Sequence, residues 1–106
     1  MHWLKGKEMA KIMIFTQVYE NYGSADKPYW KAKGGNEYVV PNFTDFNHLE
    51  GPITQIRDMV ECDDRYYRET LVDWFIADDS YLTEFEKSQL EYDGKITYSP
   101  KELVIS

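Results

Sequence analysis

The sequence predicts a single α+β domain, in which a small antiparallel sheet of three or four strands packs against two or three helices. One observation is the concentration of β-branched and aromatic residues with alternating polarity between residues 11 and 40. The other is the recurrence of apolar residues at helical spacing in the second half of the chain. The length of 106 residues fits one domain over residues 11–106, and we expect residues 1–10 to be a disordered leader or the product of an alternative start.

Three strands are predicted in the first half of the chain. Residues 11–20 form the first, because Ile, Phe, Thr, Val and Tyr favour a pleated and partly buried surface. Residues 21–28 form a loop that contains Gly, Asp and Pro, and residues 29–33 form the second strand. The Gly-Gly-Asn sequence at residues 34–36 is typical of a hairpin turn, so residues 37–40 are predicted to return as the third strand of a meander.

Two helices are predicted to follow this meander. The first begins near Pro52, a residue suited to a first helical turn, and continues to Cys62. The second is capped by Asp63 or Asp64 and ends near Asp78, because the apolar residues in between recur at helical spacing.

A third helix is predicted to begin at Ser80 or Thr83. The dipeptide Asp93-Gly94 either ends this helix or forms a hairpin turn, and we favour the helix end. Short strands are expected at residues 95–98 and 102–105. The expected core combines large apolar side chains from both halves of the chain: Ile14, Phe15, Trp30, Val39, Ile56, Leu71, Trp74 and Phe75.

The net charge of −7 is unevenly distributed along the chain. Residues 1–43 contain six lysines and four acidic residues, whereas residues 44–106 contain six basic and fifteen acidic residues. This acidity argues against non-specific nucleic-acid binding, because phosphates are repelled. The predicted partner is a protein with a basic surface, which would meet an acidic helical face formed by Asp58, Glu61, Asp63, Asp64, Asp78 and Asp79.

A second candidate surface is predicted on the second strand. Strand alternation places Tyr29, Lys31 and Lys33 on one face, and Tyr19 and Tyr22 are expected to adjoin them. Tyrosines stack on unpaired bases and lysines neutralise phosphates, so single-stranded nucleic acid or a nucleotide is the alternative ligand. We favour a protein interface built on the same tyrosines, because Tyr anchors interfaces at a low entropic cost.

No group of catalytic residues converges at a recognisable spacing, so we expect a binding protein and not an enzyme. His48 lies in a predicted loop and is interpreted as a surface residue. Cys62 has acidic neighbours, which suppress its thiolate and disfavour a nucleophile. The acidic clusters lack the spacing of a calcium loop and the chain lacks a zinc pattern, so no metal and no cofactor are expected.

A single cysteine cannot form an intramolecular disulfide, which is typical of a protein of a reducing cytosol. No apolar run in the chain is long enough for a signal peptide or a membrane span. We therefore expect a cytoplasmic protein that does not contact a membrane.

Two segments of the first half resemble a group of short uncharacterised proteins encoded by tailed bacteriophages. They are FTQVYENYG at residues 15–23 and YWKAKGGNEY at residues 29–38. The resemblance implies a bacterial host cytoplasm as the setting, and a modulator or inhibitor of a host or defence protein as the role. It assigns no role to any residue.

The predicted function is that of a small acidic protein-binding module. A homodimer formed by pairing the open edges of two sheets is a further expectation, because a short open sheet leaves strand edges unpaired.

Overall fold

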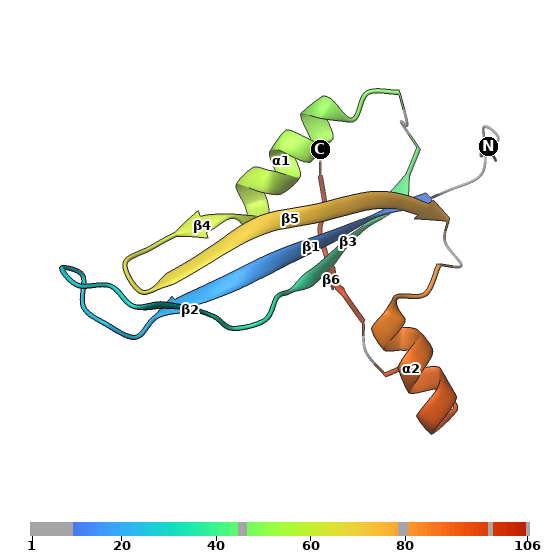
Figure 1. The fold of residues 1–106 in the computed structure, drawn as a ribbon. Coiled ribbons are helices and arrows are strands. Elements are labelled where there is room, and N and C mark those ends of the chain that lie inside the picture. The colour runs from blue at the N-terminus through green and yellow to red at the C-terminus, as the bar shows by residue number, and fades with distance from the viewer. Residues whose placement is uncertain (1–9, 45–46, 79–80, 98, 106) are drawn as a thin grey trace.

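The computed structural model describes residues 10–44, 47–78, 81–97 and 99–105 (Figure 1). Residues 1–9 of the expected leader lie outside this range, and Ala10 already belongs to the first strand. The elements in chain order are β1 (Ala10–Asn21), β2 (Trp30–Ala32), β3 (Glu37–Phe43), α1 (Glu50–Val60), β4 (Cys62–Asp63), β5 (Tyr67–Asp78), α2 (Glu84–Asp93) and β6 (Lys101–Glu102).

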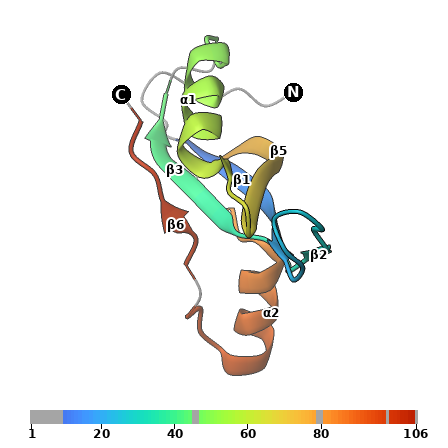
Figure 2. The same cartoon turned by 90° about the vertical axis from the view of Figure 1, so that its left-hand side faces the viewer.

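A single sheet dominates the molecule. Its strand order is β4-β5-β1-β3-β6, with β2 paired to β1, and it curls into a half-barrel (Figure 2). Strands account for 42% of the described residues, and the two helices account for 23%. The predicted small antiparallel sheet packed against two or three helices is therefore wrong. The sheet has six strands, and it is mixed because β6 runs parallel to β3.

β1 and β5 form a long antiparallel ribbon. The pairing runs from Ala10 opposite Asp78 to Glu20 opposite Tyr67, with one bulge near Val72. The predicted second helix is thus wrong, because residues 67–78 form a strand. The bulge explains the error: it separates the core-facing Leu71 and Trp74 by three residues, which imitates helical spacing.

β2 and β3 lie end to end along the other edge of β1. Val18 bonds in both directions with the segment between them, donating to the Gly34 carbonyl and accepting from the Lys33 amide, each at 2.8 Å. The predicted hairpin turn at residues 34–36 is therefore wrong, because these residues continue one return path beside β1. A Cβ on Gly35 would lie 1.9 Å from the Thr16 carbonyl oxygen, so this close approach requires glycine.

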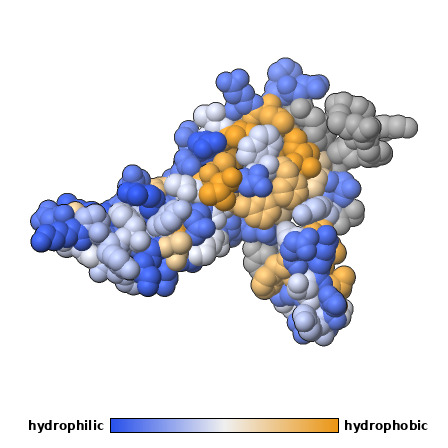
Figure 3. Space-filling model, viewed as in Figure 1, coloured by the Kyte–Doolittle hydropathy of each residue, from blue (hydrophilic) through white to orange (hydrophobic). Residues whose placement is uncertain are grey.

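The main core lies between the sheet and α1. Ile12, Ile14 and Val40 pack from the sheet against Ile56 and Val60 of the helix. Figure 3 shows hydrophobic residues gathered over this central part of the molecule. Of the predicted core residues, Ile14 and Ile56 are fully buried, and the others are partly buried: Phe15, Trp30, Val39, Leu71, Trp74 and Phe75.

The opposite face of the sheet carries a smaller aromatic cluster. Phe15 stacks on Phe75 with ring centroids 5.6 Å apart, and Tyr81 meets Phe75 edge to face at 5.1 Å. Met13 is buried on this face between its strand neighbours. Tyr81, in the segment that leads from β5 to α2, therefore covers one end of this face of the sheet.

α2 follows the prediction closely. It begins with a capping box, in which Thr83 and Glu86 satisfy each other's backbone amides, and it ends at Gly94 with a φ of 72°. The expected strand at residues 95–98 is wrong for residues 95–97, and Tyr98 lies outside the described residues. The expected strand at residues 102–105 is represented only by β6.

Candidate functional site

The end of the β1–β5 ribbon projects beyond α1 (Figure 1). This end carries exposed tyrosines. Tyr22, Tyr29, Tyr66 and Tyr67 are 53%, 61%, 52% and 36% exposed. We call these four residues the tyrosine tip. Tyr22 and Tyr29 lie in the loop between β1 and β2, whereas Tyr66 lies in the turn before β5 and Tyr67 is the first residue of β5.

Asn21 joins these two loops. Its amide nitrogen donates to the carbonyls of Ser24 (3.2 Å) and Arg65 (3.0 Å). Its amide oxygen accepts from the backbone amides of Gly23 and Tyr29, each at 2.8 Å. Asn21 is 8% exposed, so its four bonds are partly shielded from water. Asn21 therefore holds the two chain segments that carry the tyrosine tip in a fixed position relative to each other.

Part of the predicted tyrosine–lysine surface is present. The ammonium groups of Lys31 and Lys33 lie 5.7 Å and 5.3 Å from the ring centre of Tyr22. A hydrogen bond with Tyr22 raises the pKa of the Lys33 ammonium. Tyr29 is exposed beside this group, and its carbonyl accepts from the Tyr22 amide.

Tyr19 is not part of that surface. It pairs with Ala32 and Arg68, whereas Lys31 pairs with Glu20, the next residue of β1. Because successive strand residues face opposite sides, Tyr19 and Lys31 lie on opposite faces of the ribbon. On Tyr19's side, the Arg68 guanidinium lies 4.2 Å from the ring centre of Trp30. The predicted five-residue surface is therefore divided between the two faces of the ribbon.

The predicted acidic residues do not form one helical face. Asp58 is exposed on α1, Glu61 caps the end of that helix, and Asp63 lies on β4, where it bonds Arg68 at 3.0 Å. Asp64 accepts from the Arg65 amide in the following turn. Asp78 ends β5, ten residues beyond Arg68, which is about 33 Å along a strand. Asp79 lies outside the described residues.

A buried carboxylate, which the sequence analysis did not single out, lies beneath the tyrosine tip. Glu69 is 5% exposed, and its Oε2 accepts from the Thr16 hydroxyl (2.6 Å), the Tyr38 hydroxyl (2.7 Å) and the Asn36 amide (3.0 Å). Its Oε1 accepts from the Tyr67 hydroxyl at 3.1 Å. This network ties β5 to β1 and β3 where no helix of the described chain covers the sheet.

The network fixes the charge state of Glu69. Burial alone would raise the pKa of this carboxyl, but the four donors outweigh burial and lower it. Burial raises the pKa of the Tyr38 hydroxyl, and its bond to Glu69 raises it further. A carboxylate saturated with donors, with a lowered pKa, is a weak base at neutral pH. Glu69 is therefore a structural group.

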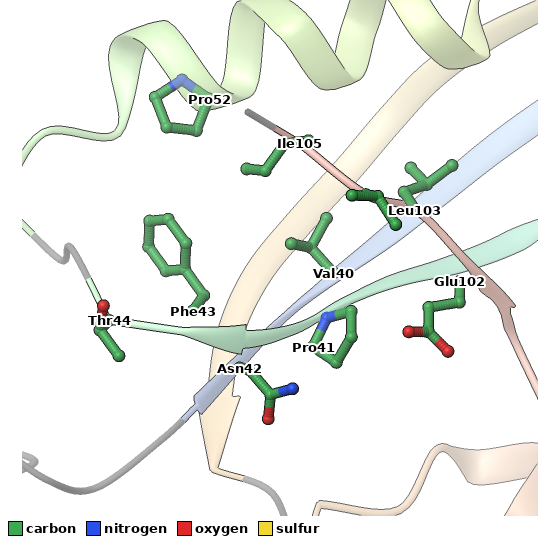
Figure 4. Close-up of a pocket in the computed structure, with 10 residues that line it drawn as sticks. Val40, Pro41, Asn42, Phe43, Thr44, Pro52, Glu102, Leu103 and Ile105 are labelled. Atoms are coloured by element: carbon green, nitrogen blue, oxygen red, sulfur yellow. The ribbon is translucent and has the colours of Figure 1, made fainter.

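Two hollows adjoin these elements. A pocket of about 310 Å³ beside Glu69 is lined by residues of β4 and β5, including Cys62 and Arg68. A groove of about 470 Å³ lies between β3, Pro52 and the C-terminal segment, and its lining is mainly apolar (Figure 4). Lys101 and Glu102 of that segment pair with β3, and the Leu103 amide donates to the Val39 carbonyl at 2.8 Å. The groove lies beside the residues that follow, where the segment diverges from the sheet.

No catalytic or metal-binding constellation is found in the described part of the chain. None of its groups of three or more His, Cys, Asp or Glu residues could hold a metal ion. His48 and Cys62 are both exposed, and Cys62 is a free thiol.

Comparisons with known proteins bring no relative: no family model, no curated protein and no solved structure matches the chain. The resemblance to bacteriophage proteins stays a prediction. Across the described residues, no helix is long and apolar enough to cross a membrane.

The sequence analysis missed three residues of the tip region: Asn21, Tyr66 and Tyr67. A weak signal was present for the last two, because aromatic residues are enriched in strands. Asn21 could not be recognised, since its role depends on the loop that β5 brings beside it.

Proposed function

We propose that this chain is a protein-binding module whose contact surface is the tyrosine tip. The observation that supports the proposal is the display of four exposed tyrosines at the ribbon end, where Asn21 fastens the loop after β1 to the turn before β5. Tyrosines offer a large, amphipathic contact area with few rotatable bonds, and a fixed base reduces the entropy lost on binding.

The sheet edges are poor alternatives for binding. On β5, the outward amide of Leu71 donates to the Glu61 carboxylate (2.9 Å), and that of Trp74 donates to the Asp73 carboxylate (2.9 Å). On β3, Pro41 occupies the next outward position after Val39 and has no amide hydrogen. Bulges, charges and proline at edges oppose strand addition. This also weighs against the expected homodimer.

The setting of this module is inferred from the sequence. Its single cysteine supports a cytoplasmic location, and the resemblance to bacteriophage proteins supports a modulator or inhibitor of a bacterial host protein. We propose no catalytic activity.

Site-specific photocrosslinking tests the contact surface. A photoreactive phenylalanine analogue is placed at Tyr29 or Tyr66, and at Tyr92 as the control, because Tyr92 is 87% exposed on α2. We expect discrete adducts with a cellular protein from the two tip positions and none from the control. Adducts from position 92 alone, or equal adducts from all three, would contradict the proposal.

A second candidate function is the binding of single-stranded nucleic acid by Tyr22, Lys31 and Lys33, which the structure brings together. The net charge of −7 opposes it, because it repels a polyphosphate chain. Filter binding of single-stranded DNA and RNA at low salt is the test, and absence of retention removes this candidate.

A further inference from the structure

We infer that the protein bound by the tyrosine tip presents carboxylate side chains to Lys31 and Lys33, from the wall of a concave surface. The inference rests on the proposed function and specifies its partner. It reverses the expectation that the partner is basic.

The two lysines are the first part of the argument. Lys31 and Lys33 flank the ring of Tyr22, and neither is in an ion pair with a carboxylate of the described chain. Glu20 is opposite Lys31 in the sheet, and its charge raises the pKa of Lys33 less than Tyr22 does. Two ammonium groups therefore face solvent beside an exposed aromatic ring, where carboxylates could bind them.

The local charge is the second part. Residues 20–33 and 63–68 hold five cationic and four acidic residues, although the whole chain has a net charge of −7. One of these acids, Asp63, is already neutralised by Arg68. With five cationic and four acidic residues, the tip has a net charge of +1 in a protein whose net charge is −7. An acidic partner would be repelled by the body and oriented toward the tip.

The shape of the tip is the third part. The molecule measures 53 × 38 × 23 Å, and the ribbon end extends its long direction past α1 (Figure 1). A narrow projecting ribbon buries most of its surface when it enters a cleft, as long loops of antibody-like binders do. The partner surface is therefore concave.

Single-stranded nucleic acid fits these observations less well. One face of the Trp30 ring is already covered by the Arg68 guanidinium and is not open for base stacking. The ammonium groups of Lys31 and Lys33 already lie 5.7 Å and 5.3 Å from the ring centre of Tyr22, so they compete with a base for this ring. A polyphosphate would also extend beyond the two lysines onto acidic surface.

Peptide selection tests the chemistry of the partner. Random twelve-residue peptides are selected on the immobilised full chain, and the enriched peptides are then synthesised and titrated by fluorescence anisotropy. We expect enriched peptides that are rich in Asp and Glu. The double variant Lys31→Glu/Lys33→Glu should weaken their binding by about tenfold or more. The matched reversal Lys87→Glu/Lys95→Glu, away from the tip, should change it by less than about twofold.

The variant Tyr29→Ser/Tyr66→Ser separates the two proposals. If it abolishes binding while Lys31→Glu/Lys33→Glu has no effect, the acidic partner is refuted and the tyrosine tip stands. If neither variant has an effect, both proposals fail. Enrichment of neutral or basic peptides, tighter binding of a fifteen-nucleotide thymidine strand, or self-association that the lysine reversal abolishes would each overturn the acidic partner.

Discussion

Glu69 shows how a single carboxylate can replace a missing hydrophobic layer. Toward the tip, the ribbon has no helix above it among the described residues, and its strands have polar side chains where the body has isoleucines. Four donors from three strands converge on this one buried group. Hydrogen bonds to a charged acceptor are stronger than neutral ones, so the network stabilises the pairing of β5 with β1 and β3.

We expect Glu69→Gln to lower the free energy of unfolding by about 1 to 3 kcal/mol, because it removes the charge without changing the shape. Urea denaturation measures the effect, with Glu84→Gln as the control, since the Glu84 side chain is 88% exposed. The folded pKa of Glu69 lies below the ordinary value of 4.5, so its stabilisation is complete above that pH and is lost as the pH falls through the folded pKa. The difference between wild type and variant should shrink accordingly in acid; a difference that does not depend on pH would contradict this role.

Glu37 has the opposite pH dependence. Its Oε2 is buried without a hydrogen-bond partner, and burial, followed by the nearby Glu86, raises the pKa of its carboxyl above 4.5. Thr83 and Lys11 offset this only in part. The stability linked to Glu37 is therefore present below pH 4.5 and is lost as the pH rises through the folded pKa.

We accordingly expect Glu37→Gln to raise the melting temperature at pH 7 and to leave it nearly unchanged at pH 4. Differential scanning calorimetry at the two pH values measures this, with the exposed Glu102→Gln as the control. Equal shifts at both values would show that the charge of Glu37 is not responsible.

At the scale of elements, the path from β2 to β3 depends on one glycine. Gly35→Ala should unfold the chain or lower its stability by several kcal/mol, because the new methyl group would collide with the Thr16 carbonyl and separate β3 from β1. Gly51→Ala is the matched control, since no atom lies within 4 Å of its added Cβ at the start of α1. The control should be neutral or stabilising by up to about 1 kcal/mol. Circular dichroism during thermal melting compares the two, and similar melting temperatures would contradict the steric argument.

The elements also show how far the sequence could predict the fold. β1, α1 and α2 were identified because their patterns are local: alternation in β1, a first-turn proline in α1, and a Ser or Thr start with a Gly94 end in α2. β5 was predicted as a helix, because the bulge at Val72 hides its alternation, and bulge formation depends on pairing with β1. The predicted acidic helical face was wrong for the same reason, because it depended on that helix. The predicted proximity of Tyr22, Lys31 and Lys33 is present in the structure, because it depends only on the short connection between β1 and β2.

At the scale of the whole molecule, an open half-barrel must avoid pairing with other sheets. Its β5 edge has three protective features between β4 and Asp78. One is the bulge at Val72, and the other two are the carboxylates of Glu61 and Asp73, which accept hydrogen bonds from outward backbone amides. These features oppose edge pairing between copies, which would otherwise join two apolar strands.

Removing the two carboxylates should therefore allow the chain to self-associate. In Glu61→Ala/Asp73→Ala, the outward amides of Leu71 and Trp74 lose their acceptors, and a strand from a second copy can supply them. We expect the wild type to remain monomeric in light scattering and the variant to form dimers or larger species as concentration rises. The control is Asp58→Ala, which removes an exposed acid of α1 that no described contact connects to the β5 edge. If the double variant stays monomeric, or if Asp58→Ala associates equally, general loss of charge or another surface governs solubility, and the edge is not protected by these side chains.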